Sequence, residues 1–125
     1  MNVAFARNEY ANAKSNALSS KSENFEAVSL ALRHLLDSMI ALKDAESPEE
    51  REPLFEKSLT SIYFLQKCLD FEQGGELARN LFKVYEYCRQ AILSFTIRAT
   101  EQTLDKAIQY VRIILEGWEG IEEEI

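Results

Sequence analysis

The sequence is poor in the residues that break helices, with two prolines and four glycines among its 125 residues. Proline and glycine punctuate turns, so this scarcity argues against a fold of many short strands joined by tight turns. The chain also lacks any apolar run approaching the ~20 residues that a membrane-spanning helix needs. We therefore expect a few long helices and no membrane insertion.

Residues suited to metal and nucleophile chemistry are equally scarce. The one histidine is His34, and Ala31 stands where the Glu-x-x-His site of di-metal bundles would need its glutamate. The two cysteines, Cys68 and Cys88, lie within apolar helical patterns, which is typical of buried free thiols rather than of a Cys-x-x-Cys pair. The sequence has no glycine-rich phosphate loop. We expect no metal, no cofactor and no enzymatic activity.

Positively charged residues are outnumbered: the sequence has 14 lysines and arginines and 21 acidic residues, which gives a formal net charge of -7. An acidic surface repels phosphate backbones and anionic lipids, so nucleic acid is not an expected partner. The first residues, Met1 to Arg7, contain no apolar core of a secretory signal, which predicts a cytoplasmic protein. A hydrophobic content of 46% over this length favours a single domain spanning residues 1–125.

Four stripes of apolar residues recur at steps of three and four, the spacing of one helix face. The stripes are Phe25, Val28, Leu32, Leu35, Met39 and Leu42; Phe55, Leu59, Ile62, Leu65 and Leu69; Leu77, Leu81, Val84, Cys88, Ala91 and Phe95; and Leu104, Ile108, Val111, Leu115 and Trp118. They predict helices over about residues 23–45, 53–72, 76–97 and 101–121. Short connections make neighbouring helices antiparallel, so the expected fold is an all-α, up-down four-helix bundle. Residues 1–20 form a flexible segment or short helix in this prediction, and residues 122–125 form an acidic tail.

Two corners of the predicted bundle carry recognisable turn residues. Ser47 followed by Pro48 and then Glu50 is typical of a helix start, but Pro53 is an equally acceptable start, and the sequence leaves the choice open. Gly74 and Gly75 predict a tight stop to the helix before them, which would end near Gln73, with a positive φ at one or both of the two glycines.

The aromatic and large apolar residues exceed what one inward stripe on each helix can hold. Second stripes run beside the main ones, and they either thicken the core or line grooves that accept an amphipathic helix of a partner. The candidate partner-binding residues are Phe64, Phe71, Phe82, Tyr85, Ile92, Tyr110 and Ile114, with Tyr10 in an N-terminal cover. A negative charge introduced in a groove should abolish binding without unfolding, whereas in the core it should unfold the protein.

Residues 69–87, LDFEQGGELARNLFKVYEY, resemble the centre of the FliS family of flagellin export chaperones. The shared features are a Leu-Asp, a Gly-Gly-Glu, an Ala-x-Asn-Leu and a Tyr-x-Tyr, in this order and spacing. Trp118 is similar to the family's tryptophan near the end of the last helix, and Tyr10 to an early tyrosine. The similarity covers about residues 54–121 well and the first half loosely, since Lys21-Ser22 stands where the family usually has Ser-Pro.

The resemblance implies a cytoplasmic export chaperone without cofactors. Such a protein binds the disordered C-terminal segment of flagellin as helices in apolar grooves, prevents its premature polymerisation and assists flagellar secretion. A component of the flagellar export gate is a further expected partner. The alternative hypothesis is a helical-bundle adaptor that self-associates as a weak homodimer through the same surface and has no flagellin client.

Overall fold

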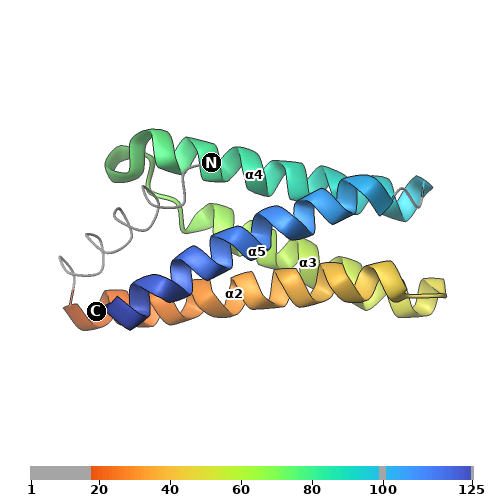
Figure 1. The fold of residues 1–125 in the computed structure, drawn as a ribbon, viewed down its shortest axis with the longest axis horizontal. Helices are drawn as coiled ribbons and strands as arrows, with labels where there is room; N and C mark the ends of the chain where they lie inside the picture. Colours follow the sequence, from red (N-terminus) through yellow and green to blue (C-terminus); the bar gives the residue numbers. More distant parts are fainter. Residues whose placement is uncertain (1–17, 99–100, 125) are drawn as a thin grey trace.

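The computed structural model describes residues 18–98 and 101–124, with side chains over residues 25–97 and 103–120. Its four helices are α2 (Leu18–Asp44), α3 (Pro48–Lys67), α4 (Phe71–Arg98) and α5 (Glu101–Glu124). This part of the chain contains no strand, and successive helices run in opposite directions (Figure 1). The predicted all-α bundle is confirmed. Helix α2 begins five residues before the predicted position 23, and the predicted tail, up to Glu124, continues α5.

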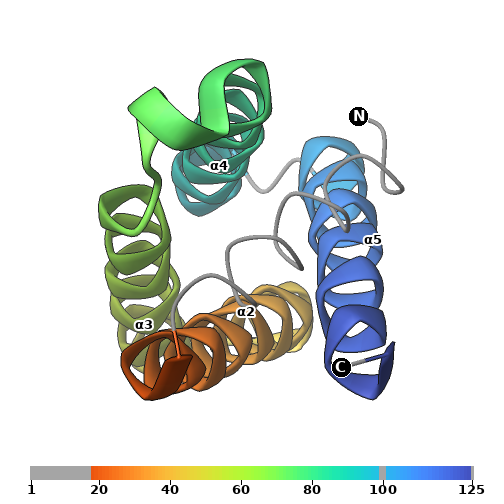
Figure 2. The ribbon, with the colours of Figure 1, turned by 90° about the vertical axis from the view of Figure 1, so that its left-hand side faces the viewer.

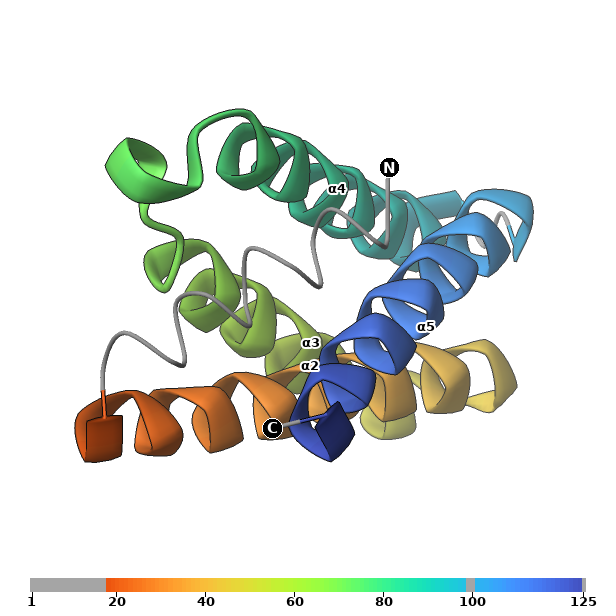
Figure 3. The same ribbon diagram turned by 60° about the vertical axis from the view of Figure 1, so that its left-hand side comes forward.

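Seen end-on, the four helices stand at the corners of a square (Figure 2). Helix α2 packs against α3 and α5, and α4 packs against the same two helices from the opposite corner. Helix α5 begins beside the end of α4 and crosses α2 obliquely (Figure 3), and Trp118 near its end stacks on Phe25 in the first half of α2. The first half of α4 and the second half of α5 therefore lie apart from one another (Figure 3).

The four apolar stripes supply the core, as their spacing predicts. Every member of the stripe in α5 is buried, and in the other three stripes most members are buried and the rest are partly covered. The partly covered members are Val28, Phe55, Leu59, Leu69 and Val84. Fully burying one such apolar side chain contributes about 1.5–3 kcal/mol, so this shared interior is the main source of stability.

The start of α3 decides between the two prolines. Ser47 is the N-cap, and its hydroxyl accepts a hydrogen bond from the Glu50 backbone N–H at 3.2 Å. The Glu50 carboxylate accepts in turn from the Glu46 backbone N–H at 2.9 Å. Pro48 occupies the first helical turn, where its missing N–H has no helical partner to lose, and Pro53 lies inside the helix.

The corner between α3 and α4 differs from the prediction. Helix α3 ends at Lys67 rather than near Gln73, because Asp70 begins a new helical turn. Its carboxylate accepts hydrogen bonds from the backbone N–H groups of Glu72 and Gln73, both at 3.0 Å. A stretch of four residues, the 71–74 turn, then leads to Gly75, which interrupts α4 with φ 48° and ψ -123°. The predicted positive φ is thus confirmed at Gly75, within α4 rather than at the end of α3.

Trp118 connects α5 to α2 by ring stacking and hydrogen bonding. Its indole ring stacks on Phe25 with ring centroids 4.4 Å apart. The indole N–H donates to the Ser29 hydroxyl at 2.6 Å and lies 3.3 Å from the Phe25 carbonyl oxygen. Two ion pairs, Arg33 with Glu119 and Lys43 with Asp105, join the same helices nearer to solvent. None of the described helices has the length and apolar character needed to cross a membrane.

Candidate functional site

The candidate partner-binding residues fall into two groups in the structure. Four aromatic side chains remain substantially exposed: Phe64 at 38%, Phe71 at 47%, Phe82 at 38% and Tyr110 at 39%. Three others are buried in the core: Tyr85 at 2% exposed, Ile92 at 0% and Ile114 at 5%. Tyr10 and its N-terminal segment lie outside the described residues. The role of the eight residues in binding a partner stays a prediction.

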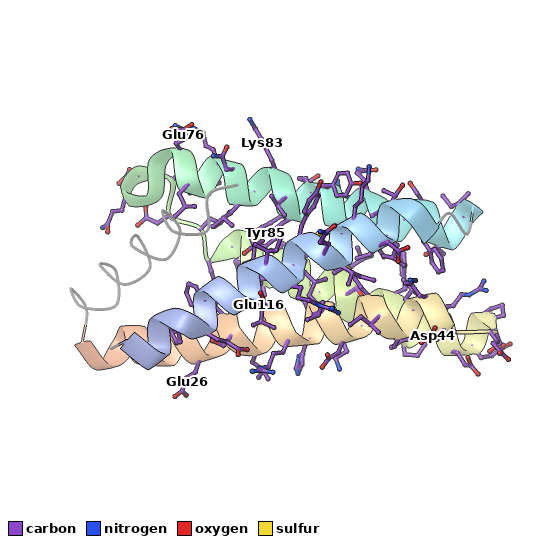
Figure 4. All side chains as sticks on the ribbon, viewed as in Figure 1. Glu26, Asp44, Glu76, Lys83, Tyr85 and Glu116 are labelled. Carbon is purple, nitrogen blue, oxygen red and sulfur yellow. The ribbon has the colours of Figure 1, made fainter. Side chains whose placement is uncertain are left out.

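The position of Tyr85 illustrates why the second stripes split. Figure 4 shows its side chain directed from α4 into the bundle, whereas Glu76 and Lys83 on the same helix point away from the bundle. Because α3 and α5 flank α4 on two sides, they cover a wider arc of α4 than a single stripe. Phe82 lies three residues before Tyr85, just beyond that arc, and stays exposed.

Two of the exposed rings meet at the α3–α4 corner. Phe71 contacts Phe82 edge-on, with ring centroids 6.1 Å apart. One turn further along α4, the Glu86 carboxylate accepts a hydrogen bond from the Gln66 side-chain amide at 2.8 Å, which ties α4 to α3. Arg89 also donates to Glu86, at 2.9 and 3.2 Å. The hydrogen bonds from Arg89 and then Gln66 lower the pKa of Glu86, so the carboxylate stays charged.

A second aromatic pair bridges α4 and α5. Tyr110 contacts the partly buried Tyr87 edge-on at 5.5 Å between ring centroids. Next to this pair and inside the bundle, the Cys88 thiol lies 3.9 Å from the Ala107 carbonyl oxygen. Burial raises the pKa of Cys88 to about 12, so this thiol is not a nucleophile at neutral pH. The predicted burial of Cys88 is confirmed, whereas Cys68, just after α3, is exposed.

Three exposed apolar residues lie outside the candidate set. Tyr63 stands beside Phe64 on α3, with the Lys67 ammonium 5.6 Å from its ring centroid, and Leu30 and Ile97 project from α2 and α4. None belongs to a stripe at helical spacing, so periodicity has no signal for them. Large apolar residues outside every stripe are the sequence feature that could have identified these positions.

The described residues hold no group of three or more histidine, cysteine or acidic side chains that could bind a metal ion. The surface chemistry of the part that the structure describes is instead aromatic and polar. Edge-to-face ring pairs with one side open to water are suited to receiving apolar side chains of another protein.

The family model described as "Flagellar protein FliS" matches residues 6–125. The chain belongs to the FliS family. It is 31% identical over 94 residues to the flagellar secretion chaperone FliS of Vibrio cholerae, a match that covers 75% of this chain and 68% of the relative. It is also 31% identical over 90 residues to the flagellar secretion chaperone FliSB of Pseudomonas aeruginosa, covering 72% of this chain and 71% of that relative. No solved structure matches the chain.

Membership of the FliS family confirms the resemblance carried by residues 69–87. The match extends from residue 6 to the end of the chain, so it includes the first half, where the sequence resembles the family loosely. Within the FliS match lie the Gly75 corner, both aromatic pairs and Trp118.

Proposed function

We propose that this FliS-family protein is a flagellar secretion chaperone whose client is the disordered C-terminal segment of flagellin. The observation that carries the proposal is the set of four exposed aromatic residues on the flanks of the bundle, Phe64, Phe71, Phe82 and Tyr110, in a chain whose relatives bear that name. The client becomes helical as its apolar face covers these rings. Held in this way in the cytoplasm, flagellin does not polymerise before it is secreted.

The expected energetics fit a reversible complex. Covering the exposed part of one aromatic ring contributes on the order of 1 kcal/mol, so four rings contribute about 4 kcal/mol. Ordering a disordered segment costs about 2–5 kcal/mol or more. The rings therefore roughly offset the ordering cost, and further apolar contacts along the client supply the net affinity. Such a complex can form before secretion and dissociate when a component of the export gate takes over the client.

The buried candidates have a supporting role in this proposal. Tyr85 and Ile92 anchor α4, which carries Phe82, and Ile114 anchors α5 one turn after Tyr110. They hold the two helices that present the exposed rings. In this proposal the N-terminal segment with Tyr10 covers the same surface when no client is bound, so removing residues 1–18 should leave the bundle folded and tighten client binding.

Calorimetric titration with a peptide of the C-terminal segment of flagellin from the same cell tests the proposal. Phe82→Glu and Tyr110→Glu should each weaken binding about tenfold or more, since a carboxylate cannot be covered by an apolar helix face without a desolvation cost. Gln90→Glu is the matched control, because it adds the same charge at an exposed position of α4, and it should bind as the wild type does.

No heat and no gain of helicity when the wild type is titrated with the flagellin peptide would exclude the chaperone role. Equal affinity in all three variants would instead exclude Phe82 and Tyr110 as client contacts. Sedimentation of the protein alone over a range of concentrations examines the alternative, a self-associating adaptor. That alternative would be favoured if the wild type does not bind the peptide but dimerises, and if the Phe82→Glu variant dimerises less than the wild type.

A further inference from the structure

The 71–74 turn is a separate structural unit at the α3–α4 corner. Asp70 caps it at the start, Gly75 breaks the helix after it, and the Asp70 carbonyl oxygen accepts from the Gly74 N–H at 2.7 Å. Phe71 is the first residue of this turn, and its side chain is almost half exposed. Among the described residues, Phe82 is the aromatic ring that it meets. Because the side chain is only partly covered, its position depends strongly on the backbone of the turn.

The two ends of the turn are defined by different physical constraints. At the start, both backbone N–H groups bound by Asp70 would lack a helical partner, and the single carboxylate oxygen Oδ1 satisfies them. At the end, Gly75 has φ 48° and ψ -123°, a backbone conformation that residues other than glycine rarely adopt. A Cβ at Gly75 would meet nothing within 4 Å, so the requirement for glycine there is conformational and not steric.

Gly74 adds a close approach between the turn and α4. A Cβ at this position would lie 3.0 Å from the Cβ of Ala78. The turn is therefore seated directly against the first regular residues of α4. This close packing places Phe71 next to Phe82, eleven residues further along the chain, and the two exposed rings form one apolar surface.

We propose that Asp70 and Gly75 are positioning residues of the client-binding surface, which hold the 71–74 turn so that Phe71 and Phe82 together receive an apolar side chain of the client helix. The inference rests on the proposed function and adds the residues that organise its surface. Without the Asp70 cap the turn populates other conformations, and the client must restore the correct one on binding. The affinity then falls by the fraction of molecules in which the turn is formed.

Titration of the full-length protein with the flagellin C-terminal peptide tests this role. Asp70→Ala should weaken binding about fivefold, the factor that corresponds to a lost cap. Asp70→Asn should stay within about twofold of the wild type, because asparagine caps as well as aspartate does. Gly75→Ala should weaken binding at least as much as Asp70→Ala. In a Phe71→Ala background, Asp70→Ala should change affinity by less than about twofold, since the residue that it positions is gone.

Ser47→Ala is the matched control. It removes the cap at the opposite end of α3 and should lower the melting temperature by a similar amount while leaving affinity within about twofold of the wild type. A merely structural role for Asp70 predicts instead that the two cap variants lose affinity equally.

The inference is overturned if Asp70→Ala binds as the wild type does, if its loss is the same in the Phe71→Ala background, or if Ser47→Ala loses as much affinity. Each of these outcomes leaves the chaperone role intact, because the wild type still binds the peptide. A wild type that does not bind the flagellin peptide overturns the proposed function, and this inference with it.

Discussion

A glutamate introduced at Ile92 should unfold the protein, whereas the same residue at Phe82 should not. Both positions lie on α4, but Ile92 is 0% exposed and Phe82 is 38% exposed. Replacing Ile92 removes about 1.5–3 kcal/mol of apolar burial, and a buried charge without a partner costs about 3–5 kcal/mol more. The sum of about 5–8 kcal/mol is comparable to the whole stability of a domain, about 5–15 kcal/mol.

At Phe82 the introduced carboxylate reaches water, and the partly exposed ring forfeits only about 1–2 kcal/mol of burial. Phe82→Glu should therefore remain folded with a reduced urea midpoint. Ile92→Val is the matched apolar control for the core position and should cost about 0.5–1.5 kcal/mol. Urea unfolding followed by circular dichroism at 222 nm measures all three variants on one scale.

The effect at position 92 should also depend on pH in a defined direction. Burial raises the pKa of the introduced carboxyl above its unfolded value of about 4.3. Between that value and the folded pKa, the unfolded chain releases a proton that the folded chain retains, so stability falls as pH rises. Ile92→Glu should thus be least destabilised near pH 4 and most destabilised above its folded pKa. Equal urea midpoints for Ile92→Glu and Phe82→Glu, unaffected by pH, would refute the core position of Ile92.

Four further predictions concern single features. Gly75→Ala should lower the free energy of unfolding by about 1–2 kcal/mol, measured in urea, because its φ of 48° is costly for a residue with a Cβ. Trp118→Phe should cost about 1–3 kcal/mol in the same assay, since it removes the N–H that Ser29 accepts. The lowered pKa of Glu86 means that its charge stabilises the fold above its ordinary pKa and stops doing so as pH falls through the folded value; Glu86→Gln should lower the urea midpoint near pH 7 but not near pH 2. With a thiol reagent at neutral pH, Cys68 should react in the folded protein and Cys88 only after unfolding.

The sequence by itself determined the fold class and the inward face of each helix. Apolar residues at steps of three and four identify one face of a helix before any partner is known, so the stripe that ends at Trp118 was predictable and is buried throughout. Turn chemistry is also local, which is why a positive φ could be expected at the glycine pair and is found at Gly75. The family was readable for a similar reason, since residues 69–87 carry its features in one continuous run.

Periodicity did not indicate where α3 ends, and the tertiary structure alone decided which second-stripe residues stay exposed. Asp70 begins a new turn after α3 because its carboxylate satisfies two N–H groups of that turn, a local hydrogen-bonding preference that hydrophobic periodicity does not detect. Phe82 and Tyr85 are three residues apart, and Tyr110 and Ile114 four apart, yet one of each pair is exposed and the other buried. Their burial depends on how far neighbouring helices wrap around α4 and α5. That coverage is set by contacts between distant parts of the chain, such as the hydrogen bond from Trp118 to Ser29 across 89 residues.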